Sequence, residues 1–227
     1  MATKKKKSTR KRKKKKGLSP FFYLLLVAGI IIALYRWLNK QEARYDNFTP
    51  AEIQTLKLTN TNYQRQVRKA AKEFGLPEEY FLALIVLECS GRKNPPSRFE
   101  KHIYKRLKNL KSGRMKKYEN LRPHHLKDAS DGALKNLASS WGPFQVMGYK
   151  CILLNIKVKD LRGKNTVYWG INWINLTYGK CLRNDEFKHA FHIHNTGRRY
   201  PRFGGSRTHD PLYVEKGLKY MEFFRME

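Results

Sequence analysis

The chain is short of acidic residues and of cysteines. Its 227 residues include 18 Asp and Glu against 48 Lys and Arg, which gives a formal net charge of +30. A surplus of this size indicates an anionic polymer or an anionic surface as the partner. The cysteines are Cys89, Cys151 and Cys181. Three cysteines form at most one disulfide within the chain, and their spacing matches no metal site, so we expect no metal ion.

Strand patterns are missing as well. The chain has no clear alternation of apolar and polar residues, no hairpin signal and no internal repeat. Apolar residues at helical spacing occur instead, next to residues that start or stop helices. They predict helices at 63–74, at 77–88, at 165–178, from 185 onward and from 210 onward. We therefore expect an all-α domain built from helices joined by long loops.

The N-terminal part separates into a basic tail and an apolar run. Every residue from Lys4 to Lys16 is Lys or Arg except Ser8 and Thr9. The apolar run at 21–38 is close to the length that spans a bilayer. The positive-inside rule then places the tail in the cytoplasm and the folded domain beyond the cytoplasmic membrane, in the periplasm or outside the cell.

These features divide the chain into a cytoplasmic tail (1–17), a transmembrane signal anchor (18–39), a linker (40–60) and a folded domain (61–227). A cleaved signal peptide is the competing interpretation, but Tyr35 stands where a cleavage site needs a second small residue. The tail suits the anionic headgroups of the membrane. Its place beside an apolar span favours this role over nucleic-acid binding, so we expect no nucleic-acid partner.

One carboxylate, Glu88, ends an apolar helical stretch. It shares a helix face with Phe81, Leu84 and Ile85, at positions i, i+3, i+4 and i+7. Burial against apolar side chains disfavours the charged form of a carboxylate, and a group in such a setting serves as a general acid near neutral pH. The competing interpretation is a solvent-facing Glu at a fraying helix end.

Four short motifs follow one another along the chain. They are Glu88-Cys89-Ser90-Gly91, Phe99-Glu100-Lys101-His102-Ile103-Tyr104, Ser140-Trp141-Gly142-Pro143-Phe144-Gln145-Val146-Met147-Gly148 and His194-Asn195-Thr196-Gly197. Their order resembles the lysozyme-like superfamily of peptidoglycan-cleaving enzymes. The first, third and fourth motifs resemble soluble lytic transglycosylases and goose-type lysozymes, and the second and third resemble bacterial N-acetylmuramidases.

The resemblance implies a lysozyme-like helical domain that cleaves the β-1,4 bond between N-acetylmuramic acid and N-acetylglucosamine. It makes Glu88 the catalytic acid. It places Gln145 and Met147 along the sugar cleft, on a short apolar helix that we expect after the tight turn at Gly142-Pro143. The other substrate-binding residues that it implies are His194, Asn195 and Tyr213.

The chain departs from the family's pattern at three places. Cys89 follows the Glu where Ser is usual, His194 replaces a Tyr, and Arg198-Arg199 stand where small residues are usual. The His keeps a hydrogen-bonding ring, so cleavage is still expected. Gln145 also has a second interpretation, as an amide whose hydrogen bonds are satisfied within the protein.

Two cleavage reactions are possible, and they differ in whether a second catalytic carboxylate is needed. A hydrolase needs another carboxylate to activate or replace water, and Glu100, Asp128 and Asp131 are the candidates. Glu100 lies in a motif, but Arg98, Lys101 or a helix N-terminus could equally hold it. A lytic transglycosylase, as that family implies, needs no second carboxylate because the 6-hydroxyl of the muramic acid attacks. Since none of the three carboxylates has a compelling setting, we favour the non-hydrolytic reaction slightly.

We therefore expect a single-pass membrane enzyme, with its N-terminus in the cytoplasm, that cuts the glycan strands of peptidoglycan without a cofactor. The alternative is a catalytically inactive module that binds peptidoglycan as a scaffold within an envelope protein complex. Sugar release by the wild type and by Glu88→Gln would separate the two.

Overall fold

The computed structural model describes residues 20–45 and 47–226, with side chains at 23–36 and at 47–226. The chain divides into two units, residues 1–47 and residues 48–227. Most of the described residues are helical, which confirms a mainly α-helical protein. The helices are α1 (Pro20–Tyr45), α2 (Pro50–Phe74), α3 (Glu78–Cys89), α4 (Lys101–Lys111), α5 (Asp131–Leu137), α6 (Lys150–Leu153), α7 (Thr166–Arg183), α8 (Phe187–Thr196), α9 (Tyr213–Arg225) and two 3₁₀ turns, η1 (Pro123–Leu126) and η2 (Val158–Leu161).

The first unit contains α1, which includes the apolar run. Its large apolar side chains from Tyr23 to Tyr35 are all more than half exposed. Within 20–45 and 47–226, no helix is both long enough and apolar enough to cross a membrane. The predicted tail at 1–17 lies outside the described residues, as do the side chains at both ends of the predicted span at 18–39.

The second unit begins with a capped helix. Thr49 is the N-cap of α2: its hydroxyl accepts the backbone N–H of Glu52, and the Glu52 carboxylate accepts the N–H of Thr49 at 2.8 Å. This reciprocal pair is the capping box that the Thr-Pro-Ala-Glu sequence predicts. Gly75, with φ of 61°, ends the helix in the left-handed conformation. α2 therefore extends through 50–60, assigned above to the linker.

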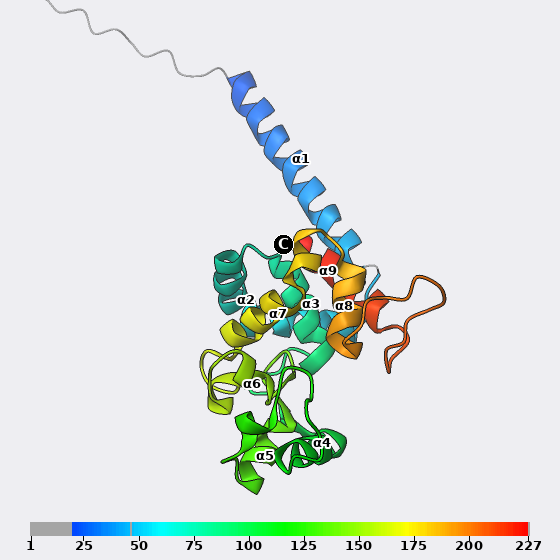
Figure 1. Ribbon diagram of the computed structural model, residues 1–227. Coiled ribbons are helices and arrows are strands. Elements are labelled where there is room, and N and C mark those ends of the chain that lie inside the picture. The colour runs from blue at the N-terminus through cyan, green and yellow to red at the C-terminus, as the bar shows by residue number, and fades with distance from the viewer. Residues whose placement is uncertain (1–19, 46, 227) are drawn as a thin grey trace, which may run out of the picture. The chain divides into compact units, whose positions relative to one another are not determined.

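α3 forms the centre of the second unit. All its residues from Tyr80 to Val86 are buried. α2 and α9 pack directly against it, and α7 and α8 complete the bundle (Figure 1). The Tyr80 ring packs on Phe191 of α8, with 4.6 Å between the ring centroids. A helix that is apolar on all sides must be buried on all sides, and the surrounding helices of the bundle bury α3 in this way.

Residues 98–149 form a small lobe at one end of the second unit, drawn in green in Figure 1. Besides α4, η1 and α5 it contains three strands, β1 (Arg98–Phe99), β2 (Ser139–Trp141) and β3 (Val146–Met147). The strands pair antiparallel in the order β1-β2-β3. The sequence gives no signal for these strands, because strands of two or three residues are too short to show alternation.

The third motif is a hairpin, and the short apolar helix expected after Gly142-Pro143 is wrong. β2 and β3 flank a turn in which Gly142 and Gln145 adopt left-handed φ angles of 71° and 46°. A Cβ at Gly142 would lie 2.2 Å from Oγ1 of Thr166, so only glycine fits there. Short apolar runs occur in strands as well as in helices, and spacing alone does not separate them.

Candidate active site

Glu88 lies in the last turn of α3, where the chain leaves the core. Ser90 and Gly91 follow with left-handed φ angles of 53° and 69° and end the helix. Leu84 and Ile85, on the same face, are fully buried, as the helical spacing predicts. The side chain of Glu88 is 17% exposed. Glu88 therefore has one side against the protein and one side open to solvent.

α9 brings a second group to Glu88. The hydroxyl of Tyr213, in the first turn of α9, donates a hydrogen bond to Oε1 of Glu88. Burial raises the pKa of the Tyr213 hydroxyl well above its ordinary value of 10.0, and the Glu88 charge raises it further. The phenol therefore keeps its proton and remains a donor to the carboxyl group.

His194 approaches Glu88 from α8. Its Nε2 lies 3.7 Å from Oε1 of Glu88 and 3.1 Å from the carbonyl oxygen of Phe144. A carbonyl oxygen can only accept, so Nε2 carries a hydrogen and donates it to Phe144. In a neutral ring Nδ1 is then an acceptor, and the hydroxyl of Tyr178, 2.6 Å away, donates to it.

The His194 ring is uncharged at neutral pH. Burial lowers the pKa of His194 below its ordinary value of 6.5, although the Glu88 charge and the Phe144 carbonyl act in the opposite direction. Glu88 and His194 therefore lie close together without forming an ion pair. Glu88 forms no ion pair with a Lys or Arg anywhere in the described part of the chain. Its neighbours are the Tyr213 hydroxyl, which donates to it, and the neutral ring of His194.

A chain of hydroxyl groups continues behind His194. Tyr80 of α3 donates to the hydroxyl of Tyr178 over 3.4 Å, and Tyr178 donates to the imidazole. Both tyrosines are buried, and burial raises the pKa of each hydroxyl above 10.0. The hydrogen bonds therefore run in one direction, toward Nδ1. Sequence reasoning missed both tyrosines, because a contact between separate helices leaves no local pattern.

The two hairpin residues assigned to the sugar cleft have structural partners. The Gln145 amide donates to the carbonyl oxygen of Gly142 at 3.0 Å and accepts from the Ser140 hydroxyl at 2.7 Å. These bonds favour the interpretation of Gln145 as an amide satisfied within the protein. Met147 is half-buried in β3. The hairpin reaches the candidate site through the carbonyl group of Phe144 instead.

Asn195 follows His194 near the end of α8 and is exposed. Its side chain makes no hydrogen bond within the described residues, so the amide is open to a ligand. Gly197, with φ of 73°, ends the helix directly afterwards. The fourth motif thus presents one neutral ring to Glu88 and one free amide to solvent.

The other candidate carboxylates belong to the small lobe. Glu100 pairs with Arg98 at 3.0 Å, and Asp131 accepts the hydroxyl of Tyr104. Asp128 is exposed. As far as the structure describes the chain, none of the three makes a hydrogen bond or ion pair with the carboxyl group at the end of α3. Among the described residues, the candidate site offers one carboxyl group, that of Glu88.

No family model, curated protein or solved structure matches this chain. The lysozyme-like resemblance therefore stays a proposal, which depends on the motifs and on the contacts around Glu88.

Three of the four motifs lie next to one another in the folded chain. His194 of the fourth motif lies beside Glu88 of the first and hydrogen-bonds Phe144 of the third.

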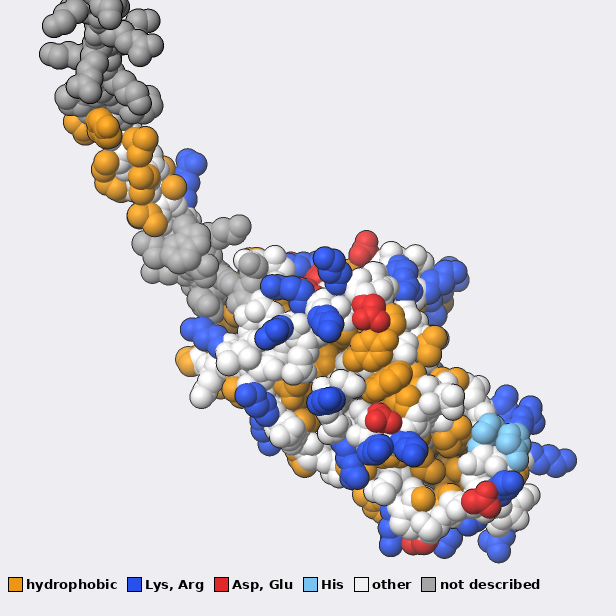
Figure 2. Space-filling view, turned by 90° about the vertical axis from the view of Figure 1, so that its left-hand side faces the viewer, with side chains coloured by type: hydrophobic (Ala, Val, Ile, Leu, Met, Phe, Trp, Pro, Cys, Tyr) orange, Lys and Arg blue, Asp and Glu red, His pale blue; other side chains and the backbone are white. Residues whose placement is uncertain are grey.

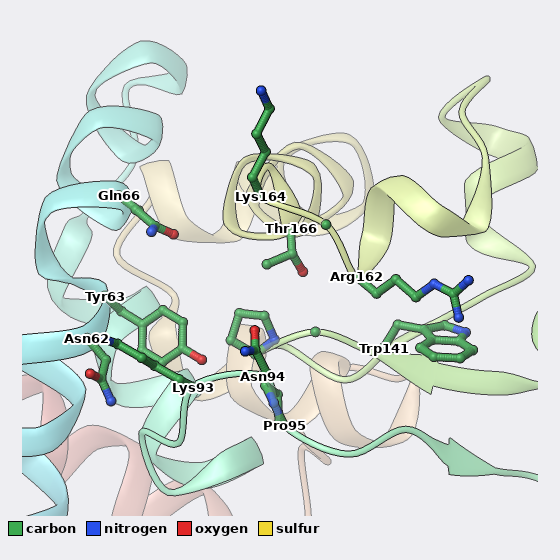
Figure 3. A pocket seen from close by; sticks show the side chains of 13 residues that line it. Asn62, Tyr63, Gln66, Lys93, Asn94, Pro95, Trp141, Arg162, Lys164 and Thr166 are labelled. Atoms are coloured by element: carbon green, nitrogen blue, oxygen red, sulfur yellow. The ribbon is translucent and has the colours of Figure 1, made fainter.

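A separate pocket of about 340 Å³ lies between α2, the hairpin turn and the start of α7. Figure 3 shows the rings of Tyr63 and Trp141 at its two ends and the amide groups of Gln66 and Asn94 near the first ring. Ring faces beside a few polar groups are typical of small-molecule sites. Glu88 is not among the residues that line this pocket.

Proposed function

We propose that this chain is a membrane-anchored enzyme that cleaves peptidoglycan glycan strands between N-acetylmuramic acid and N-acetylglucosamine, with Glu88 as general acid and base. The environment of Glu88 is the main support for this proposal. One partly exposed carboxyl group at the end of a buried helix receives the Tyr213 hydroxyl and faces the neutral ring of His194. A group so placed can give a proton to a bound glycosidic oxygen.

We favour the non-hydrolytic reaction. Glu88 would protonate the glycosidic oxygen as the bond to C1 breaks. It would then take the proton of the muramic acid 6-hydroxyl as that oxygen attacks C1, which gives a 1,6-anhydro end without consuming water. Hydrolysis through a second carboxylate has less support, because Glu100 and Asp131 are engaged by other side chains and Asp128 is exposed.

The charge of the chain supports an anionic polymer as the substrate. Figure 2 shows Lys and Arg side chains spread over the visible surface of the second unit, with few acidic side chains between them. Long-range attraction to an anionic cell wall would raise the rate of encounter. Binding to purified sacculi should weaken as salt is added, and a salt-independent affinity would contradict this argument.

The same proposal places the chain in the cytoplasmic membrane. The residues at 1–17 would form the cytoplasmic tail and those at 18–39 the membrane anchor. The exposed apolar side chains of α1 between Tyr23 and Tyr35 support this role, because lipid is the solvent that suits them. The catalytic domain would then lie on the far side, with peptidoglycan.

The variant Glu88→Gln tests the proposal. Gln keeps the size and the hydrogen bonding of Glu but has no proton to give, so cleavage of purified sacculi should fall at least about a hundredfold. The melting temperature should stay the same or rise, because a partly buried carboxyl group becomes a neutral amide. Glu79→Gln is the matched control on the same helix, since Glu79 pairs with Arg225. A folded Glu88→Gln protein with wild-type cleavage would refute the proposal.

Mass analysis of the products separates the two reactions. Anhydro-muramic ends identify a transglycosylase, and reducing ends identify a muramidase. Glu100→Gln should leave cleavage intact in the first case. Loss of cleavage in Glu100→Gln, together with reducing ends, would establish the hydrolase instead.

An inactive peptidoglycan-binding scaffold within an envelope protein complex is the second candidate, and the pocket in Figure 3 favours it. The pocket presents ring faces and amides without including Glu88. In this case the wild type would release no sugar from sacculi. Replacing Gln66 and Asn94 by alanine would weaken binding to sacculi, and Glu88→Gln would not.

A further inference from the structure

The segment 198–207, here called the arginine loop, follows α8. Its basic residues are Arg198, Arg199, Arg202 and Arg207. Lysines outnumber arginines across the chain, yet the stretch between Lys188 and Lys216 contains no lysine. The planar guanidinium group holds several donors in a fixed fork, which matches the oxygens of phosphate better than an ammonium group does. The composition of the loop therefore indicates an oxyanion as its ligand.

His192 holds both ends of the arginine loop on one ring. The His192 residue is 1% exposed. Its Nδ1 donates to the carbonyl oxygen of Arg198 at 2.7 Å, and its Nε2 accepts the backbone N–H of Arg207 at 3.2 Å. Tyr200 packs edge-on against the same ring, with 5.3 Å between the centroids. The loop backbone is thus held before any ligand arrives, which lowers the entropic cost of binding.

The loop borders a hollow of about 580 Å³. The residues that line the hollow are His192, Thr196, Arg198, Arg199, Pro201, Arg202, Phe203 and Arg207. Arg199 pairs with Glu186 at 2.9 Å. The other three arginines take part in no ion pair among the residues that the structure describes. Their like charges repel one another around the hollow, and an anion bound between them would remove that repulsion.

Phe203 indicates which source of phosphate the loop meets. Phe203 as a residue is 82% exposed, and the guanidinium carbon of Arg202 lies 5.6 Å from its ring centroid. Exposed aromatic side chains beside cationic ones are typical of segments at the boundary between lipid headgroups and acyl chains. We propose that the arginine loop docks on an anionic phospholipid surface, where its guanidinium groups bind lipid phosphates and Phe203 enters this boundary. A soluble phosphate would leave Phe203 in water.

Docking of the loop goes beyond the proposed cleavage and does not depend on it. The loop begins directly after Gly197, at the end of the helix that presents His194 to Glu88. A docked loop would therefore hold the candidate site close to the lipid surface. Only glycan strands near the membrane would then be within its reach.

Hydrogen–deuterium exchange of the full chain tests the docking locally. Vesicles of phosphatidylcholine with one third phosphatidylglycerol should slow amide exchange at 198–207 at least about fivefold relative to phosphatidylcholine alone. The variant with Arg198→Gln, Arg202→Gln and Arg207→Gln should lose this protection, and Phe203→Ser should lose part of it. Because the basic tail is expected to bind anionic vesicles in every variant, only exchange within the loop is compared.

The matched control removes the same charge elsewhere, through Arg114→Gln, Lys116→Gln and Lys117→Gln, all at exposed residues. It should keep the protection of the loop, and both triple variants should melt at the wild-type temperature. Equal exchange with the two kinds of vesicle, or equal loss of protection in the two triple variants, would overturn the docking. Protection by inorganic phosphate alone, as strong as that by anionic vesicles, would assign the loop to soluble phosphate and overturn the lipid proposal.

Discussion

The hydroxyl of Tyr213 donates a hydrogen bond to Oε1 of Glu88 across 125 residues of chain. Tyr213 begins α9 and Glu88 lies near the end of α3, so their contact exists only because the two helices pack together. Gly217, one turn further along α9, allows α8 to approach as well, since a Cβ there would lie 2.8 Å from the Phe191 ring. The C-terminal helix is therefore part of the candidate site.

Tyr213→Phe should lower the rate of sacculus cleavage about tenfold, because it removes one hydrogen bond to a carboxyl group and keeps the ring. Tyr220→Phe is the matched control on the same helix, since its hydroxyl donates to Glu52 instead, at 3.2 Å. Cleavage rates and melting temperatures of both variants are the measurements. Equal losses of activity in the two variants would show that the Tyr213 hydroxyl has no special role.

Protonation of His194 should destabilise the fold in mild acid. The pKa of His194 lies below 6.5 in the folded protein because of burial. As the pH falls through 6.5, the unfolded chain gains a proton that the folded chain does not, so stability present above this pH is lost below it. Denaturant unfolding between pH 8 and about pH 5 should show a steeper loss for the wild type than for His194→Gln. Identical pH profiles would contradict a buried neutral imidazole.

Gly91→Ala should destabilise the protein more than Gly75→Ala does. Both glycines have left-handed φ angles, 69° and 61°, so both substitutions strain the backbone by about 1 kcal/mol. Only at Gly91 would the new Cβ also meet backbone, 2.8 Å from the nitrogen of Thr59. We expect a further loss of about 1–3 kcal/mol in the free energy of unfolding there. Cleavage should fall too, because Gly91 sets the turn after Glu88.

A reporter fused after Glu227 tests the topology. The basic tail and the apolar run predict that the C-terminus lies outside the cytoplasm. A reporter enzyme that works only after export should then be active, and one that works only in the cytoplasm should be silent. The opposite pattern would refute the localisation and remove peptidoglycan as an accessible substrate.

Local sequence patterns determined most of the helical architecture. The capping box at Thr49 and Glu52, the stop at Gly75 and the apolar α3 each depend on residues within a few positions of one another, and short-range sterics and hydrogen bonds decide such features. The resemblance also named Glu88 as the catalytic acid and Tyr213 as a substrate-binding residue, but it did not predict that their side chains touch.

Tertiary structure alone decided the sheet of the small lobe and the environment of the carboxyl group. Strands as short as β1 and β3 exist because distant segments pair, and Gln145 is satisfied because the hairpin turn folds back on it. The tautomer of His194 follows from a carbonyl group 50 residues away and a tyrosine on another helix. The direction of a hydrogen bond depends on which donor lies next to which acceptor in the folded protein. The spacing of residues along the chain does not show which groups will become neighbours.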